Sequence, residues 1–256
     1  MSDLIERSLQ RVLALQVRLY ACQARLGGFT DAEALHDLRI TLRQLRSLLR
    51  PMRGLATVDA LEQAAAVLGR LTGPLRDREV LMAELERMGL SRLLAFDQEA
   101  HARAFAAVAS SRELAELIAL LDSWPVAWRE AARRGQLHSV SKRIQRRLRR
   151  QQAQLAQALR DPAHDRHRLR LLIKRVRYAG ETYPLQSGLD RAALARLKRA
   201  QSALGDWHDH LQWLAQSEVI EALHPCREAW LQGQLAAEER ADGALIALFG
   251  DFPLGE

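Results

Sequence analysis

Several residue types are scarce in this chain of 256 residues, and each shortage excludes a class of protein. The two cysteines, Cys22 and Cys226, match no metal-binding or redox spacing, so we expect buried thiols in a reducing compartment. Proline and glycine are sparse and runs of β-branched residues are nearly absent. Leucine, alanine, arginine and glutamine, which favour helices, dominate instead. The sequence therefore predicts an all-α protein.

Long apolar runs are also missing. No stretch approaches the roughly 20 apolar residues that a membrane-spanning helix needs. The first residues, MSDLIERSLQ, mix acidic and basic side chains and do not resemble a signal peptide. We therefore expect a cytoplasmic protein without membrane contact.

Basic residues outnumber acidic ones, 38 to 31, which leaves a net charge of +7. This excess favours a polyanionic partner without identifying it. Aromatic residues make up only 5% of the chain, whereas surfaces that bind single-stranded nucleic acid need aromatic side chains for base stacking. No helix-turn-helix pattern stands out either. Nucleic acid is therefore the less favoured polyanion.

Two rows of basic residues have the spacing of one helix face. The first stripe consists of His36, Arg39, Arg43, Arg46 and Arg50. The second stripe consists of His167, Arg170, Lys174 and Arg177. Steps of three and four residues place all members of a stripe on one side of a helix. Like charges in a row repel one another, so such a stripe makes sense when an anion with many charges lies along it.

A second row, of leucines, accompanies the first stripe at the same spacing. It consists of Leu35, Leu38, Leu42, Leu45 and Leu49. At about 100° per residue this apolar row lies beside the basic one, so the helix buries its leucines and keeps its cations at the edge of the packed face. From His36 to Arg46 the stripe is about 15 Å long.

The two stripes belong to an internal repeat. A shift of 131 residues places His36 on His167, and a shift of 132 places a second block, from Leu71, on one from Ala203. Two blocks in the same order predict a duplicated helical unit of about 110–120 residues. We therefore predict two helical bundles, residues 1–130 and 131–256. If these halves pack around a pseudo-twofold axis, the two stripes face each other across one groove.

Helix signals divide the first half at Gly27-Gly28, Pro51 and Gly73-Pro74. We expect Thr30 or Asp31 to cap the helix of the first stripe. The expected helices are about 3–26, the first-stripe helix ending near Pro51, 57–88 with a bend at Gly73-Pro74, 91–109, 137–160, 164–183, 189–221 and 225–248. Trp124-Pro125 and Gly135 predict a short helix plus a linker over 111–135.

The stripes suit phosphate chemistry. A guanidinium is a planar fork that grips phosphate oxygens in pairs and keeps its charge, lysine adds a point charge, and histidine can donate to phosphate. Parts needed to cut phosphate are absent from the sequence pattern: there is no carboxylate cluster for Mg²⁺, no glycine-rich loop ending in Lys-Ser/Thr and no paired metal histidines. We therefore predict a binding protein rather than an enzyme, without metal or cofactor.

Other polar residues allow two interpretations. Arg143 and Arg147, in a run without acids, extend the anion surface or form a plain solvated face. Asp77 and Asp209 occupy matching positions in the repeat, and we favour structural roles for them over catalysis. The histidines without ligand spacing are interpreted as surface or core residues: His138, His164, His208 and His210.

These motifs resemble the CHAD domain, the conserved histidine α-helical domain. The resemblance rests on H-x-L-R-x-x-x-R-x-L-R from His36 and L-R-D-x-x-V from Leu75, and on the corresponding blocks from His167 and Gln201. It covers roughly residues 3–245. It implies two pseudo-twofold-related four-helix bundles with basic side chains around a central groove, which bind inorganic polyphosphate and localise to polyphosphate granules.

The resemblance also implies which residues contact polyphosphate. They are His36, Arg39, Arg43, Arg46, His167, Arg170, Lys174 and Arg177. Arg50 joins them by geometry alone, since its counterpart is Glu181. Many family members follow a CYTH triphosphatase domain with an E-x-E-x-K signature, but Glu84-Leu85-Glu86-Arg87 lacks the lysine, so no triphosphatase activity is expected. The alternatives are a nucleic-acid-binding helical protein and an accessory subunit of a triphosphatase or polyphosphate enzyme.

Overall fold

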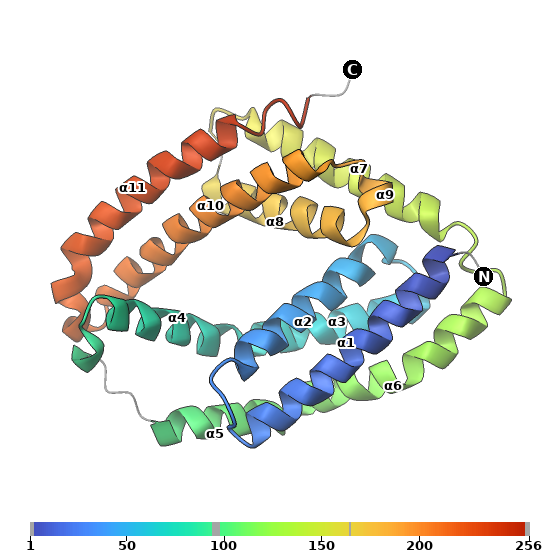
Figure 1. The fold of residues 1–256 in the computed structure, drawn as a ribbon, viewed down its shortest axis with the longest axis horizontal. Coiled ribbons are helices and arrows are strands. Elements are labelled where there is room, and N and C mark those ends of the chain that lie inside the picture. Colours follow the sequence, from blue (N-terminus) through green and yellow to red (C-terminus); the bar gives the residue numbers. More distant parts are fainter. Residues whose placement is uncertain (1–2, 94–97, 164, 254–256) are drawn as a thin grey trace. The chain divides into compact units, whose positions relative to one another are not determined.

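The computed structural model describes residues 3–93, 98–163 and 165–253, and these form helices and turns without a strand. The predicted all-α class is therefore confirmed. In chain order the elements are α1 (Asp3–Gly27), α2 (Ala34–Leu49), η1 (Arg50–Met52), α3 (Ala56–Leu71), α4 (Gly73–Arg87), η2 (Ser91–Leu93), α5 (Gln98–Ala109), α6 (Arg112–Arg133), α7 (Val140–Leu159), α8 (Arg166–Thr182), α9 (Pro184–Ser187), α10 (Arg191–Ser217), η3 (Glu221–Cys226) and α11 (Arg227–Ile246) (Figure 1).

Contacts divide the chain into two compact units, Met1–Arg143 and Ile144–Glu256. The sequence placed the division after residue 130. The structural division comes later because α6 continues to Arg133 and because Arg143, near the start of α7, bonds to the first unit. The internal duplication and its symmetry axis stay predictions.

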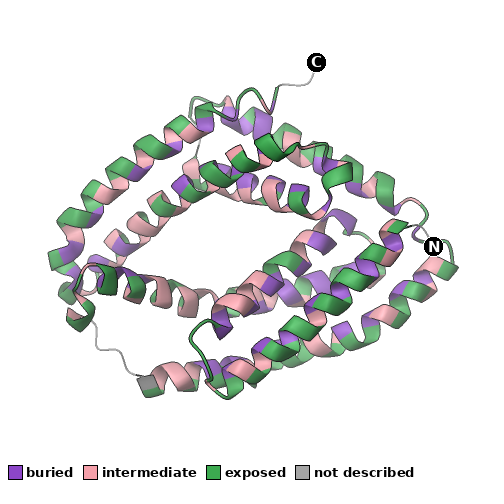
Figure 2. Ribbon diagram, viewed as in Figure 1, coloured by how far each residue is buried: buried purple, intermediate pink, exposed green. Residues whose placement is uncertain are grey.

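The first unit contains a ring of four helices. Helix α1 packs against α2, α2 against α3, α3 against α6, and α6 against α1 (Figure 1). Buried and exposed positions alternate along these helices, as amphipathic patterns require (Figure 2). Cys22 of α1 is buried in this unit, and burial raises the pKa of its thiol.

The second unit is built around a core shared by α7, α8, α10 and α11. Its members include Leu155 of α7, Ile173 of α8, Leu204 of α10 and Leu245 of α11. Asp165 begins α8 by accepting a hydrogen bond from the His167 backbone N–H, and Asp190 caps α10 in the same way. Cys226 is also buried, so both thiols are inside their units as expected.

Helix α6 contradicts the predicted short helix and linker over 111–135. It is continuous for 22 residues with Pro125 inside it. The indole N–H of Trp124 donates to the Thr57 carbonyl oxygen at 2.7 Å, and that of Trp128 donates to the Ile5 carbonyl oxygen at 3.1 Å. The two indoles stack on each other with centroids 4.7 Å apart. These contacts with α3 and α1 hold the helix through a residue that would otherwise break it.

Two further boundaries differ from expectation. The stretch 57–88 is two helices separated at Thr72, with Pro74 in the first turn of α4, where a missing N–H costs nothing. The capping residue of α2 is Glu33 rather than Thr30 or Asp31, although Asp31 accepts a hydrogen bond from the Glu33 backbone N–H at 3.0 Å. Part of the helix expected over 91–109 falls on residues 94–97, which lie outside the described residues. None of the described helices is long and apolar enough to cross a membrane.

Candidate anion-binding site

Helix α2 carries the first stripe as its periodicity predicts, except that Arg50 is the first residue of η1. All five leucines of the accompanying row are buried, with exposed fractions of at most 2%. Within the stripe Arg43 is exposed, and His36, Arg39, Arg46 and Arg50 are half-buried. The predicted geometry of a buried leucine face bordered by cations is therefore present in the first unit.

Arg39 serves partly as a structural residue. Its Nη1 donates to the Gly69 carbonyl oxygen at 3.0 Å and to Thr72 Oγ1 at 3.1 Å, at the end of α3. Carbonyl groups at a helix C-terminus lack partners and attract cations, so Arg39 caps α3. Burial lowers the pKa of Arg39, and the charge of nearby Asp77 opposes that shift. The guanidinium keeps its charge, since the pKa of arginine starts so high.

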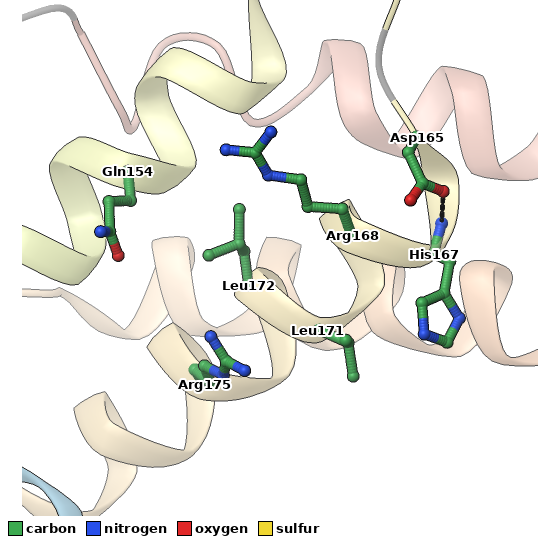
Figure 3. Close-up of a pocket in the computed structure, with 7 residues that line it drawn as sticks. All are labelled: Gln154, Asp165, His167, Arg168, Leu171, Leu172 and Arg175. Carbon is green, nitrogen blue, oxygen red and sulfur yellow. Dashed lines mark hydrogen bonds between the residues drawn. The ribbon is translucent and has the colours of Figure 1, made fainter.

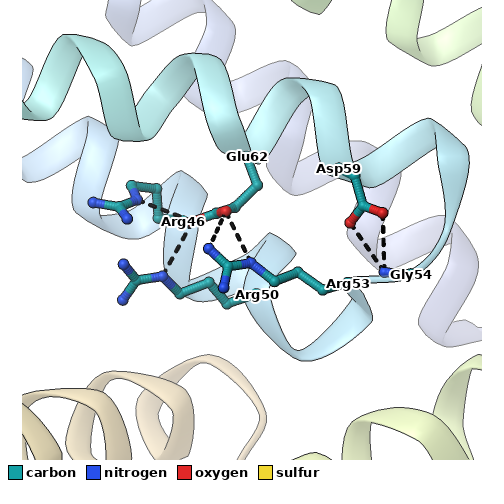
Figure 4. A network of polar contacts seen from close by, with 6 residues as sticks. All are labelled: Arg46, Arg50, Arg53, Gly54, Asp59 and Glu62. Carbon is teal, nitrogen blue, oxygen red and sulfur yellow. Dashed lines mark hydrogen bonds and ion pairs between the residues drawn. The ribbon is translucent and has the colours of Figure 1, made fainter.

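The C-terminal end of the first stripe converges on a carboxylate that sequence reasoning missed. Arg46 and Arg50 each donate through Nε to Glu62 Oε1 at 3.1 Å, and Arg53 donates through Nε to Glu62 Oε2 at 2.9 Å (Figure 4). Glu62 belongs to α3 and its side chain is only 3% exposed. The sequence pattern of α2 alone contains no signal for this acid, because it lies on another helix.

Arg143 and Arg147 were predicted as additional anion contacts on α7. Arg143 Nη1 donates to the Arg53 carbonyl oxygen at 3.1 Å, so this guanidinium fixes the turn after η1. Gly54, in that turn, has φ +90° and a Cβ there would lie 2.8 Å from Arg143 Nη1, so the close approach requires glycine. Arg147 is half-buried.

Helix α8 carries the second stripe. Leu169, Leu172, Ile173 and Val176 are buried in the second unit. His167 at the start of the helix is exposed, and Arg170 and Lys174 are half-buried. The two stripes therefore occupy similar positions on their own helices, each beside an apolar face. The central groove between them stays a prediction.

Arg177, at the end of the second stripe, is held by its neighbours. Its guanidinium carbon lies 4.4 Å from the ring centroid of Tyr178, a cation–π distance. Its Nη1 lies 3.5 Å from Glu181 Oε1. The Tyr178 hydroxyl accepts a hydrogen bond from Gln201 Nε2 at 3.0 Å, which connects α8 to α10.

His208 is a second residue whose place the sequence did not reveal. It lies on α10 with its ring centroid 5.4 Å from that of His167, and its Nδ1 is buried without a hydrogen-bond partner. Burial, together with the charges of Arg170, His167 and Lys174, lowers the pKa of His208 to about 4. A neutral imidazole therefore faces the second stripe. The packing of α8 against α10, not a spacing rule, brings the two histidines together.

The other predicted polar residues lie apart from this arrangement. His210 is bonded through Nδ1 to the Asp206 carbonyl oxygen at 2.7 Å, and its ring fills the space beside Gly233 of α11. His138 bonds to the Gly135 carbonyl oxygen at 2.6 Å. Asp77 is exposed and Asp209 is half-buried, and their structural roles stay predictions. His164 lies outside the described residues.

A cavity of about 300 Å³ opens beside the N-terminal half of α8 (Figure 3). Leu171 and Leu172 form its apolar part, while Arg168 and Arg175 line it with positive charge. Gln154 of α7 closes the opposite side, and Arg168 extends toward it. His167 is the one member of the stripes among the lining residues of this cavity.

Metal ligands do not gather anywhere in the described part of the chain: no group of three or more His, Cys, Asp or Glu residues there could hold a metal ion. The side chains of the stripes carry guanidinium, ammonium and imidazole groups. Such groups bind oxyanions.

Comparisons with known proteins identify the family and the fold of the chain. The family model of the CHAD domain matches residues 12–218. The crystal structure of the CHAD domain from the plant Ricinus communis has a similar fold, with a TM-score of 0.69. It is 24% identical in sequence, over 97% of this chain and 91% of that one. No curated protein matches the chain.

Proposed function

Because this chain belongs to the CHAD domain family, we propose that it binds inorganic polyphosphate without chemically altering it. CHAD domains are associated with polyphosphate-related proteins. The observation that carries the proposal is the pair of basic rows on α2 and α8, each beginning with a histidine and each bordering a buried apolar face. A linear chain of phosphates matches a linear row of cations, because each can pair with successive partners along its length.

Two carboxylates beside the stripes, Glu62 and Glu181, are engaged by cations of the stripes, which supports binding rather than catalysis. Glu62 is held by three arginines, and Glu181 pairs with Arg177. Such acids are engaged with cations of the site itself and are poorly placed to hold Mg²⁺ or to activate water. Polyphosphate incubated with the protein and Mg²⁺ should keep its chain length and release no phosphate. Affinity for a long polyanion would also bring the protein to polyphosphate granules.

The sharpest test removes one exposed or half-exposed cation from each stripe. Arg43 and Lys174 are the choice, because they occupy corresponding positions in the two stripes and Arg43 is exposed. We expect the double variant Arg43→Gln/Lys174→Gln to bind long-chain polyphosphate roughly tenfold more weakly at low salt. The magnitude of the slope of log K against log salt should fall by about 1.4, because the variant makes two fewer phosphate contacts and binding therefore releases fewer counterions.

The matched control removes the same charge elsewhere. Arg112 and Arg129 of α6 are exposed and belong to neither stripe, so Arg112→Gln/Arg129→Gln should bind almost as the parent does. Equal losses in both double variants would mean that only net charge matters. Unchanged affinity in the stripe variant would refute the proposed site.

A further inference from the structure

The three arginines around Glu62 use only some of their N–H donors to bind its carboxylate. Arg46 and Arg50 approach the carboxylate through Nε, and Arg53 does so through Nε and Nη2 (Figure 4). A guanidinium has five N–H donors, of which four belong to the two terminal nitrogens. Glu62 therefore holds Arg46 and Arg50 by one donor each and leaves their terminal nitrogens available.

These terminal nitrogens reach the surface. The side chains of Arg46 and Arg50 are 25% and 32% exposed, and in the described part of the chain neither donates to another protein group. The Nη atoms of both arginines point away from Glu62 (Figure 4). Pairs of terminal N–H groups on a fixed guanidinium are the donors that phosphate oxygens accept from.

The charge of the cluster favours an external anion. Three guanidiniums and one carboxylate leave two positive charges uncompensated. Burial alone would raise the pKa of Glu62, but hydrogen bonds from Arg53 and Arg46 outweigh it and hold the pKa below its ordinary value. The carboxylate is therefore ionised at neutral pH, and its 3% exposure leaves it no freedom to turn away from the arginines.

We propose that Glu62 is a positioning residue, which holds Arg46, Arg50 and Arg53 as a clamp for one phosphoryl group of the polyphosphate chain. Arg53, which belongs to neither stripe, is thereby a member of the site. The gain from such positioning is entropic: immobilising a long side chain on binding costs about 0.5–1.5 kcal/mol, and Glu62 removes part of that cost beforehand. Arg143 adds to the rigidity, because it fastens the Arg53 backbone. This inference rests on the proposed function.

The test shortens the positioning side chain while keeping its charge. Glu62→Asp should bind long-chain polyphosphate roughly threefold to tenfold more weakly, because an arginine side chain that Glu62 no longer holds must be immobilised on binding. Glu84→Asp is the control, since Glu84 is also a buried acid bonded to an arginine, Arg87, outside the stripes. It should bind as the parent does. Thermal unfolding of both variants establishes that each is folded.

A double-mutant cycle separates positioning from a general structural effect. In an Arg46→Gln/Arg50→Gln background the clamp is already lost, so adding Glu62→Asp should cost no further affinity. A loss that persists in that background, or one equal to that of Glu84→Asp, would overturn the inference. So would parental affinity in Glu62→Asp itself.

A second variant keeps the inference testable if Glu62→Asp does not fold. Arg53 is 46% exposed, and Arg53→Gln leaves Glu62 with two arginine partners. This variant should also bind roughly threefold to tenfold more weakly; unchanged affinity would remove Arg53 from the site. If the parent protein fails to bind polyphosphate in the same assay, the proposed function fails and the clamp fails with it. Parental binding with unaffected variants refutes the clamp alone.

Discussion

Arginines of one stripe have different tasks. Arg39 donates to the end of α3, Arg46 and Arg50 are held by Glu62, and Arg43 is exposed. Spacing along a helix places all four on one face but says nothing of these partners, because each partner lies on α3. At the scale of single residues, the sequence therefore identifies the cations and the structure distinguishes their roles.

His208 leads to a prediction about stability. Burial, with the charges of Arg170, His167 and Lys174, lowers its pKa from 6.5 to about 4 in the folded chain. Between these values the unfolded chain binds a proton that the folded chain does not, so the free energy of unfolding falls as pH drops through this window. At about 1.4 kcal/mol per pKa unit, we expect His208 to account for about 3 kcal/mol of that fall.

Denaturant unfolding between pH 4 and pH 7 measures this effect. His208→Gln cannot titrate, so its free energy of unfolding should depend less on pH than that of the parent. His138→Gln, which changes an exposed histidine, should leave the pH dependence close to that of the parent. Parallel curves for the parent and His208→Gln would show that His208 is not the group responsible.

At the scale of helices, close packing between α10 and α11 depends on a glycine. A Cβ on Gly233 of α11 would overlap the ring of His210 on α10, whose Nδ1 is bonded to the Asp206 carbonyl oxygen. Alanine favours a helix over glycine by about 1 kcal/mol, but forcing a side chain from its place costs about 1–3 kcal/mol. We expect Gly233→Ala to destabilise the protein by roughly 1 kcal/mol.

Two comparisons separate the opposing effects. In a His210→Ala background the overlap disappears, so Gly233→Ala should stabilise by about 0.5–1 kcal/mol. Gly243→Ala, in the same helix with open space beside it, should stabilise similarly without any second change. If Gly233→Ala stabilises the parent as Gly243→Ala does, His210 does not occupy that space. Thermal or chemical unfolding provides the measurement.

Two prolines show that tertiary packing can override a local helix-breaking signal. Pro74 begins α4, as its missing N–H favours, whereas Pro125 lies inside α6 without ending it. The difference is the pair Trp124 and Trp128, whose indole N–H groups bond to α3 and α1. From the sequence alone Pro125 predicts a helix break, because the local pattern does not show the contacts of Trp124 and Trp128 with other helices.

At the scale of the whole molecule, net charge and composition determine which polyanion competes best. The chain carries +7 and few aromatic residues, so it attracts phosphates but offers little surface for stacking bases. We expect single-stranded DNA, at equal phosphate concentration, to displace bound polyphosphate poorly. A competition titration at fixed salt measures this. Easy displacement by DNA would favour nucleic-acid binding over the proposed function.

The sequence by itself determined the all-α class, the helices that carry the stripes and the burial of the leucine row beside the first stripe. These follow from periodicity, which is local: residues three and four apart share a helix face whatever else the chain does. Tertiary structure alone decided that Glu62 gathers three arginines, that His208 faces His167 and that α6 continues through Pro125. Each of these needs two helices distant in sequence to pack together, and no spacing within one helix encodes its neighbour.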